Sequence, residues 1–204
     1  MIYLLVLLLA TVVASVIVRG PVGPHQVTYS VKALTDTRRW GSSIPLAKPH
    51  KRRILISIFS PLNKNADCHL AQPLSYLPPA TATTYGGVLE SLGLPNYLLD
   101  GFELQFCQPL SHEPKSDIDY PVVIFSPGFG NSRLLSSAQA QSLASHGYTV
   151  ITVDHPYEAT IVEFPSGEVV YGYNLTDFNN DLAEKFVKVS NFMSAIYSYE
   201  MVHG

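Results

Sequence analysis

Charged residues are scarce in this chain, because they make up 14% of its 204 residues against 47% hydrophobic residues. A sequence so poor in charge and so rich in apolar side chains argues against intrinsic disorder. Beyond residue 60, five Lys/Arg stand against fifteen Asp/Glu, and the net charge of the whole chain is −3. This balance gives no support to nucleic-acid binding.

The one local excess of positive charge falls within residues 21–60, where seven Lys/Arg accompany a single acidic residue. Its densest part is the cluster Lys48, Lys51, Arg52 and Arg53. Such a cluster is typical of a solvated loop or a strand edge, and contact with an anionic surface is the alternative interpretation.

Cysteine is scarce too, since the chain contains only Cys68 and Cys107. In an oxidising compartment such a pair favours a disulfide, and closing a loop of about 39 residues would stabilise the fold by about 4 kcal/mol. His69 follows Cys68 directly, but no second His/Cys pair has the spacing of zinc ligands. The sequence therefore predicts no metal site.

Charge is almost absent from the N-terminus, where residues 2–18 form a largely apolar run that would span about 26 Å as a helix. Residues 1–20 are predicted to be a signal peptide cleaved near Ala14 or Ser15, which makes this a secreted protein. Because no Lys or Arg precedes the run, a membrane anchor through residues 2–18 is the alternative. A glycosylation sequon at Asn174 agrees with export.

The first part of the exported chain has the pattern of an antiparallel hairpin. Residues 27–31 alternate apolar and polar side chains, as in a half-buried strand, and residues 53–59 have the pattern of its partner. The polar residues 35–51 would connect the two strands. Prolines interrupt residues 61–121, which are predicted to form an irregular excursion with one short helix over residues 86–92.

The pattern then changes to that of a parallel α/β unit. Residues 122–125 and 148–153 are short apolar runs, predicted as buried strands, the first of them on both faces. Residues 132–145 between them suit a helix. A small hairpin over residues 163–170 and an amphipathic helix over residues 179–201 follow. The predicted fold class is α/β, with a βαβ unit after an N-terminal hairpin.

The segment most informative about chemistry is the turn after residues 122–125, which contains Gly128, Phe129 and Gly130. A Gly-X-Gly turn after a buried strand directs peptide N–H groups into the crevice where α/β sheets bind ligands. This arrangement suits the oxyanion loop of a hydrolase. A second interpretation is the dinucleotide-binding turn of an oxidoreductase, in which Asp154 would bind a hydroxyl of the ribose. A third is a tight turn with no role in chemistry.

Four stretches of the sequence resemble a known family: LTDTRRW, PPATA, PVVIFSPGFGNSR and LASHGYTVITVDHPYEATIVEFPSG. They are similar to the plasma-type platelet-activating factor acetylhydrolases and their secreted fungal relatives. The likeness runs from about residue 27 to residue 172. It implies an incomplete α/β-hydrolase fold, in which residues 21–204 are the N-terminal portion of the domain and stop before the nucleophile elbow.

The resemblance also implies an activity. The family members are carboxylic ester hydrolases that cleave the sn-2 acetyl or short acyl ester of 1-alkyl-2-acetylglycerophosphocholine without a metal or cofactor. By position, Phe129 would supply a backbone N–H to the oxyanion, and Gly128 and Gly130 would permit the turn. The expected partners are a phospholipid or small ester substrate and the surface of a membrane or lipoprotein.

The catalytic serine, aspartate and histidine of such an enzyme follow one another in that order, and none is identifiable in this sequence. The near match to Gly-X-Ser-X-Gly at residues 130–134 lacks the second glycine and lies in the turn itself. Asn131 or Ser132 is expected instead to cap the following helix. The sequence therefore predicts that this chain is inactive by itself.

The competing class of function is a non-catalytic secreted glycoprotein, derived from a hydrolase, that binds a lipid or a partner. An incomplete sheet would leave residues 122–125 and 150–153 without neighbours on one side and expose an apolar edge.

The polar residues 154–158 suit an acid–base or metal site or, alternatively, hydrogen bonds to adjoining loops. The sequence leaves the oligomeric state open.

Overall fold

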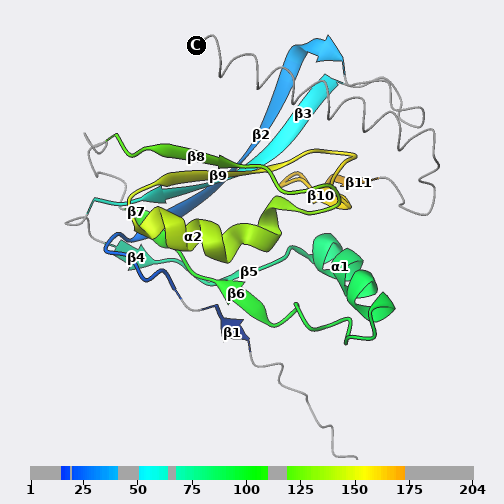
Figure 1. The fold of residues 1–204 in the computed structure, drawn as a ribbon, viewed down its shortest axis with the longest axis horizontal. Helices are drawn as coiled ribbons and strands as arrows, with labels where there is room; N and C mark the ends of the chain where they lie inside the picture. The colour runs from blue at the N-terminus through cyan, green and yellow to red at the C-terminus, as the bar shows by residue number, and fades with distance from the viewer. Residues whose placement is uncertain (1–14, 19, 41–50, 64–67, 110–118, 173–204) are drawn as a thin grey trace, which may run out of the picture.

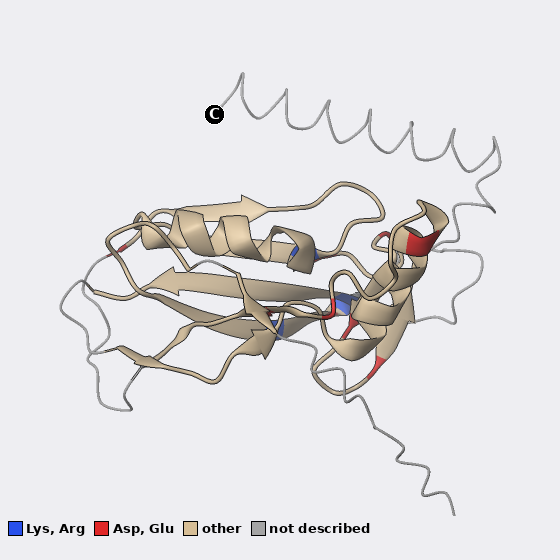
Figure 2. Ribbon diagram, turned by 90° about the horizontal axis from the view of Figure 1, so that it is seen from below, with Lys and Arg blue, Asp and Glu red and all other residues tan. Residues whose placement is uncertain are grey.

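The computed structural model describes residues 15–18, 20–40, 51–63, 68–109 and 119–172. Strands between residues 27 and 154 form a six-stranded sheet of order β4-β7-β2-β3-β9-β8 (Figure 1). A three-stranded sheet has the order β1-β6-β5, and β10 and β11 form a separate hairpin. Charged positions are sparse along the described chain (Figure 2).

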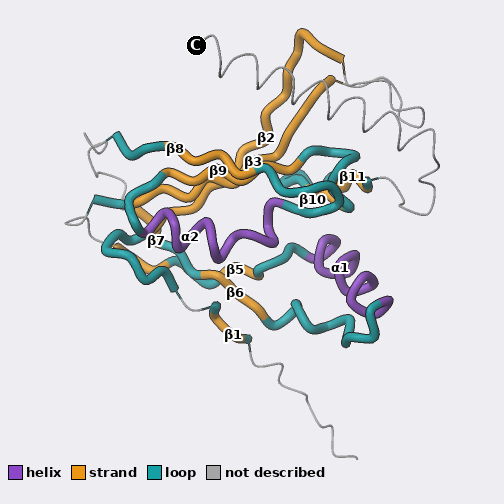
Figure 3. Tube along the Cα trace, in the orientation of Figure 1, coloured by secondary structure: helices purple, strands orange, loops and turns teal. Residues whose placement is uncertain are grey.

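The longest strands of the large sheet are the antiparallel pair β2 (Val27–Trp40) and β3 (Lys51–Pro61). The predicted hairpin is confirmed, although β2 continues nine residues beyond the expected end at residue 31. One face of β3 is fully buried over residues 55–59, because Leu55, Ser57 and Phe59 are each 0% exposed. The far ends of both strands project beyond the rest of the sheet (Figure 3).

The predicted βαβ unit is also confirmed. Strand β8 (Val122–Phe125) runs parallel to β9 (Thr149–Asp154), with Val122 opposite Thr149 and Phe125 opposite Thr152. Between them the chain forms a 3₁₀ turn, η1 (Arg133–Ser136), and then the helix α2 (Ser137–Ser145). Gly147 follows the end of the helix by two residues, and its φ of +95° is a conformation that favours glycine.

The exposure of β8 corrects one expectation. Residues 122–125 were predicted to be buried on both faces, but Val122 is 59%, Ile124 70% and Phe125 42% exposed. The reason is that β8 lies at the edge of the sheet and pairs only with β9 among the described strands. β8 thus forms the exposed apolar edge that we expect of an incomplete sheet. The same expectation for residues 150–153 is wrong, because β9 pairs with β3 on one side and with β8 on the other.

The core lies between the sheet and α2. Phe59 contacts Tyr29 and Phe106, and the last two rings stack with their centroids 4.7 Å apart. The small side chains of Ala140 and Ala144 bring α2 close to this cluster. A second cluster places Leu55 of β3 against residues of the β10–β11 hairpin, which comprises β10 (Ile161–Glu163) and β11 (Val169–Tyr171).

The excursion over residues 61–121 is more ordered than predicted. It contains four short strands, β4 (Cys68–Leu70), β5 (Leu74–Ser75), β6 (Phe102–Leu104) and β7 (Cys107–Pro109). Its helix, α1 (Pro79–Ser91), begins seven residues before the predicted start at residue 86. Proline is well tolerated in the first turn of a helix, so Pro79 starts α1 rather than interrupting it. The carboxylate of Glu163 accepts the Thr81 N–H at 2.9 Å and so caps this turn from another element.

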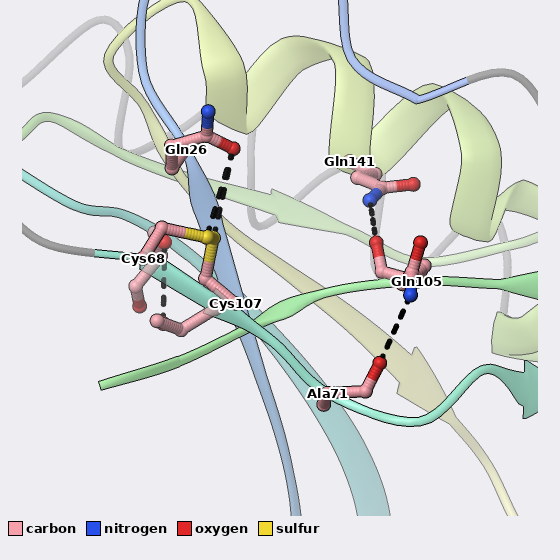
Figure 4. Close-up of a disulfide and its surroundings, with 8 residues drawn as sticks. Gln26, Cys68, Ala71, Gln105, Cys107 and Gln141 are labelled. Atoms are coloured by element: carbon pink, nitrogen blue, oxygen red, sulfur yellow. Dashed lines mark hydrogen bonds between the residues drawn. A yellow bond between two sulfur atoms is a disulfide. The ribbon is translucent and has the colours of Figure 1, made fainter. Parts of the chain in front are cut away.

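The predicted disulfide between Cys68 and Cys107 is present and joins β4 to β7 (Figure 4). The amide oxygen of Gln26 lies 3.6 Å from the sulfur of Cys107. Nearby, Gln141 of α2 donates to the Gln105 carbonyl at 2.8 Å, and Gln105 donates to the Ala71 carbonyl at 3.1 Å (Figure 4).

The end of the apolar N-terminal run takes part in the fold. Strand β1 (Val16–Ile17) pairs in parallel with β6, opposite Phe102 and Glu103. Within the described residues, no helix is long and apolar enough to cross a membrane. Four features of the sequence named above lie outside the described residues: residues 1–14 of the predicted leader, Lys48, the sequon at Asn174 and the helix expected over residues 179–201.

Candidate active site

The Gly-X-Gly turn lies at the carboxyl end of β8, where α/β sheets bind ligands. Gly130 has φ of +81°, a left-handed conformation that favours glycine, so this residue fixes the path of the turn. The Asn131 N–H donates to the Gly128 carbonyl at 3.0 Å and closes it. Phe129 lies at the tip, with its side chain 44% exposed.

The turn is tied at Gly130 to the segment after β9. The Gly130 N–H donates to the Glu158 carbonyl at 3.0 Å. The Gly130 carbonyl accepts from the Thr160 N–H at 3.2 Å and from the Thr160 hydroxyl at 2.7 Å. A third donor to this carbonyl is the Tyr85 hydroxyl of α1, at 3.1 Å. Both peptide groups of Gly130 are therefore held in place.

Tyr85 fixes the next part of the turn as well. Its hydroxyl accepts the Ser132 N–H at 2.8 Å while it donates to Gly130. Burial raises the pKa of the Tyr85 hydroxyl above its ordinary value, so the group stays protonated and able to donate. The Ser132 hydroxyl accepts the Leu134 N–H at 3.3 Å, which confirms Ser132 as the N-cap of η1.

A buried ion pair anchors the start of η1 to the end of β9. Arg133 and Asp154 are in direct contact, and the Arg133 N–H also donates to the Asp154 carboxylate at 2.6 Å. The guanidinium donates to Ser57 at 2.9 Å, and Ser57 lies 3.0 Å from the Tyr29 hydroxyl. Burial raises the pKa of the Asp154 carboxyl, and the positive charge of Arg133 opposes this effect.

This ion pair argues against the dinucleotide interpretation. Asp154 is 0% exposed and both of its oxygens are bonded to Arg133, so it has no face for a ribose hydroxyl. Arg133 also occupies the position of the third glycine in that fingerprint. Asp154 instead holds the helix that follows the turn.

A second pair at this edge of the sheet was missed in the sequence. Ser126 directly follows β8, His155 directly follows β9, and the Ser126 Oγ lies 2.9 Å from the His155 Nε2. A signal was available, because both residues lie just beyond predicted strands whose carboxyl ends are side by side in a parallel sheet. A local motif such as Gly-X-Ser-X-Gly does not indicate this pair, because its two members are 29 positions apart.

No metal centre is found in the described part of the chain, where no group of three or more His, Cys, Asp or Glu side chains gathers. Cys68, beside His69, is used in the disulfide. Of the residues 154–158, Asp154 and the Glu158 carbonyl make structural hydrogen bonds to the turn. The site thus consists of the turn itself and the Ser126–His155 pair.

Known proteins are similar to this chain in the region that contains the turn. The family model for platelet-activating factor acetylhydrolase, isoform II, matches residues 97–168, which include the whole turn. A "probable 1-alkyl-2-acetylglycerophosphocholine esterase" of Arthroderma benhamiae is 30% identical over 181 residues, which cover 84% of this chain and 45% of that protein. The resemblance stated from the sequence is confirmed.

A solved structure agrees with the fold class. The ferulic acid esterase of Streptomyces cinnamoneus is similar with a TM-score of 0.57 and 25% identity, over 88% of this chain and 48% of that one. The fold is therefore α/β-hydrolase-like, as predicted. The chain spans about half the length of the relatives it matches.

Proposed function

We propose that this chain, as a relative of the platelet-activating factor acetylhydrolases, is part of a carboxylic ester hydrolase that acts on phospholipids with a short sn-2 acyl group. The observation that supports this proposal is the position of Phe129, in a turn locked by Gly130 at the carboxyl end of β8. In this site the Phe129 N–H stabilises the oxyanion of a tetrahedral intermediate.

The rigidity of the turn supports this role. Donors that stabilise a developing negative charge act best when they are already oriented, so that no reorganisation accompanies the reaction. Hydrogen bonds from Tyr85 and Thr160 fix the Gly130 carbonyl, and Glu158 fixes its N–H. The Phe129 N–H shares its peptide group with the Gly128 carbonyl, and this carbonyl accepts the Asn131 N–H at 3.0 Å, so the group that carries the proposed donor has little freedom to turn.

The reaction is acyl transfer to a serine followed by hydrolysis, with a second donor N–H next to the nucleophile. No Gly-X-Ser-X-Gly elbow occurs in the sequence. The proposal is therefore that residues 1–204 by themselves do not turn over 1-alkyl-2-acetylglycerophosphocholine, and that Gly128, Phe129 and Gly130 act together with a triad not contained in them.

A segment exchange tests this role. In the Arthroderma benhamiae protein, the stretch aligned with residues 97–168 is replaced by that of this chain, and hydrolysis of 1-alkyl-2-acetylglycerophosphocholine is measured against the parent. We expect the activity to persist. Phe129→Pro, which removes the N–H, should then lower kcat about 100-fold or more, because one oxyanion donor contributes a factor of this order.

The matched control is Phe129→Ala, which keeps the N–H and removes only the ring. Its kcat should stay within about 10-fold of the exchanged protein, since the peptide group and not the side chain acts on the oxyanion. A folded exchange protein without activity beside an active parent would contradict the proposal, as would equal losses in the two Phe129 variants.

The proposal includes export and contact with a lipid surface. A disulfide between Cys68 and Cys107 suits an oxidising compartment. Large apolar side chains are exposed at the end of α1 and in the turn beyond it, at Val88, Leu92 and Leu94. Such side chains suit contact with a membrane or lipoprotein from which a phospholipid is drawn.

One observation favours a second candidate, a non-catalytic lipid-binding module. A cavity of about 470 Å³ lies between β2, β6 and the β10–β11 hairpin. Its wall is largely apolar and includes Tyr29, Leu104, Phe106 and Phe164. A rise in the thermal transition of residues 1–204 on adding a lysophospholipid would favour this candidate, and an unchanged transition would count against it.

A further inference from the structure

The Ser126–His155 pair has the geometry of a nucleophile and its base. The Ser126 Oγ and the His155 Nε2 are 2.9 Å apart, within the range over which an imidazole accepts a hydroxyl proton. Ser126 is exposed and His155 is half-buried, so a small ester can reach the hydroxyl while the ring stays against the protein.

The backbone around His155 is strongly constrained. Its carbonyl accepts the Glu158 N–H at 3.1 Å and the Ala159 N–H at 3.0 Å, which closes a tight turn. Within that turn Tyr157 has φ of +75°, a left-handed conformation that is costly for a residue with a side chain. Such strain persists only where the surroundings hold it, and it is common at functional sites.

Residues next to Ser126 and His155 in the sequence hold the backbone of both residues in place. Asp154, just before His155, is held in the buried ion pair with Arg133. Ser126 lies at the end of β8 and two residues before Gly128, at the start of the locked turn. An acyl carbonyl attached to Ser126 would therefore form beside a turn whose peptide groups are already oriented.

We propose that Ser126 and His155 form a nucleophile–base pair of their own, which accepts an acyl group from small activated esters such as aryl acetates. The Ser126 Oγ attacks the ester carbonyl carbon while its proton passes to the His155 Nε2. The new Oγ–C bond replaces the C–O bond to the aryl group, which leaves as the phenolate, and His155 releases the proton to water.

The acetyl-serine then returns to serine by hydrolysis. A water molecule attacks the acetyl carbon while His155 accepts one of its protons, and His155 then donates this proton to the Ser126 Oγ as the Oγ–C bond breaks, which releases acetic acid and restores the hydroxyl. This turnover is slow. No hydrogen bond joins the other ring nitrogen of His155 to any residue that the structure describes, and a triad without its carboxylate loses about 10⁴ in kcat.

The pair is independent of the proposed phospholipid esterase, because it needs neither the Gly-X-Ser-X-Gly elbow nor a phospholipid. It is tested on residues 1–204 with an alkyl fluorophosphonate, which transfers its phosphorus to Oγ with loss of fluoride. We expect one adduct per chain in the intact mass, located on Ser126 by fragmentation of the peptide that spans residues 116–133.

Three variants identify the origin of the adduct. Ser126→Ala should abolish it, and His155→Gln should slow its formation about 100-fold, the contribution of a positioned general base. The matched control is Ser166→Ala, which removes another exposed serine hydroxyl, in the turn of the β10–β11 hairpin, and should label like the parent.

Circular dichroism of each variant should match the parent, since Ser126 and Ser166 are exposed. For a protein with that spectrum, three results would overturn the proposal: no adduct on the parent chain, an adduct on another residue, or an unchanged labelling rate in His155→Gln. The exchange experiment in the Arthroderma benhamiae protein has a different substrate and readout, so failure of one proposal is distinguishable from failure of the other.

Discussion

Gly130 is the residue on which the geometry of the turn depends. It has a left-handed backbone and joins the turn to two distant segments, α1 through Tyr85 and the segment after β9 through Glu158 and Thr160. A side chain at this position would not be blocked by its neighbours, because an added Cβ would meet nothing nearer than the Thr160 hydroxyl at 3.6 Å. The requirement for glycine is thus one of backbone conformation.

Gly130→Ala should therefore destabilise the chain by about 1–2 kcal/mol, the cost of a left-handed conformation for a residue with a Cβ. The measurement is urea-induced unfolding of residues 1–204. Gly128→Ala is the control, since Gly128 has no positive φ and an added Cβ would lie 3.7 Å from the Asn131 side chain. If the two variants lose equal stability, the turn does not depend on the backbone of Gly130.

At the scale of the element, β8 is the unusual strand. It lies at the edge of the large sheet with Val122, Ile124 and Phe125 exposed, and natural proteins usually protect such an edge with charge or proline. An apolar edge strand can pair with a second copy and begin aggregation.

Ile124→Lys should slow aggregation of residues 1–204 and change their stability by no more than about 0.5 kcal/mol, as for other surface substitutions. Light scattering at raised temperature measures the effect. Val22→Lys is matched in charge and in exposure, since Val22 is 73% and Ile124 70% exposed, but Val22 lies outside the strands. Equal protection by both variants would assign the effect to net charge rather than to the edge.

The elements that the sequence predicts best are those with a regular period. The alternation at residues 27–31 and the apolar runs at 122–125 and 148–153 correspond to β2, β8 and β9. The burial of β8 was not predictable, because a short apolar run looks the same whether it lies inside a sheet or at its edge. The start of α1 was not predictable either, because a proline interrupts a helix everywhere except in its first turn, and the sequence does not show which position Pro79 takes.

The site was only partly predictable for a similar reason. Gly128, Phe129 and Gly130 are contiguous, so a local motif indicates them. The Ser126–His155 contact joins residues 29 positions apart, and the bond of Tyr85 to Gly130 joins residues 45 apart. Contacts of this kind follow from strand order and helix placement, which a motif does not encode.

At the scale of the whole molecule, the disulfide joins the excursion to the large sheet. It closes a loop between Cys68 and Cys107, 39 positions apart, that contains α1, β5 and β6. These elements supply Tyr85 to the turn and Leu104 to the core. The cross-link therefore supports the site indirectly, by restricting the segment that brings Tyr85 to it.

Replacing both cysteines by serine should lower the free energy of unfolding by about 4 kcal/mol, the loop-closure contribution for a loop of this length. Urea denaturation with and without reductant measures it. Reductant should destabilise the parent to the same extent and leave the double variant unchanged. A parent insensitive to reductant would show that the cross-link does not stabilise this chain.

The two ends of the long β2–β3 pair also differ in how fast their amide protons should exchange with solvent. Near Val27 and Phe59 these strands lie in the buried core, and residues 55–59 of β3 pair with β9 as well. Toward Asp36 and Arg52 the same two strands pair with each other alone, among the described strands. Amide protons at the two ends of one strand should therefore exchange with solvent on very different timescales, from global unfolding at one end to local fraying at the other.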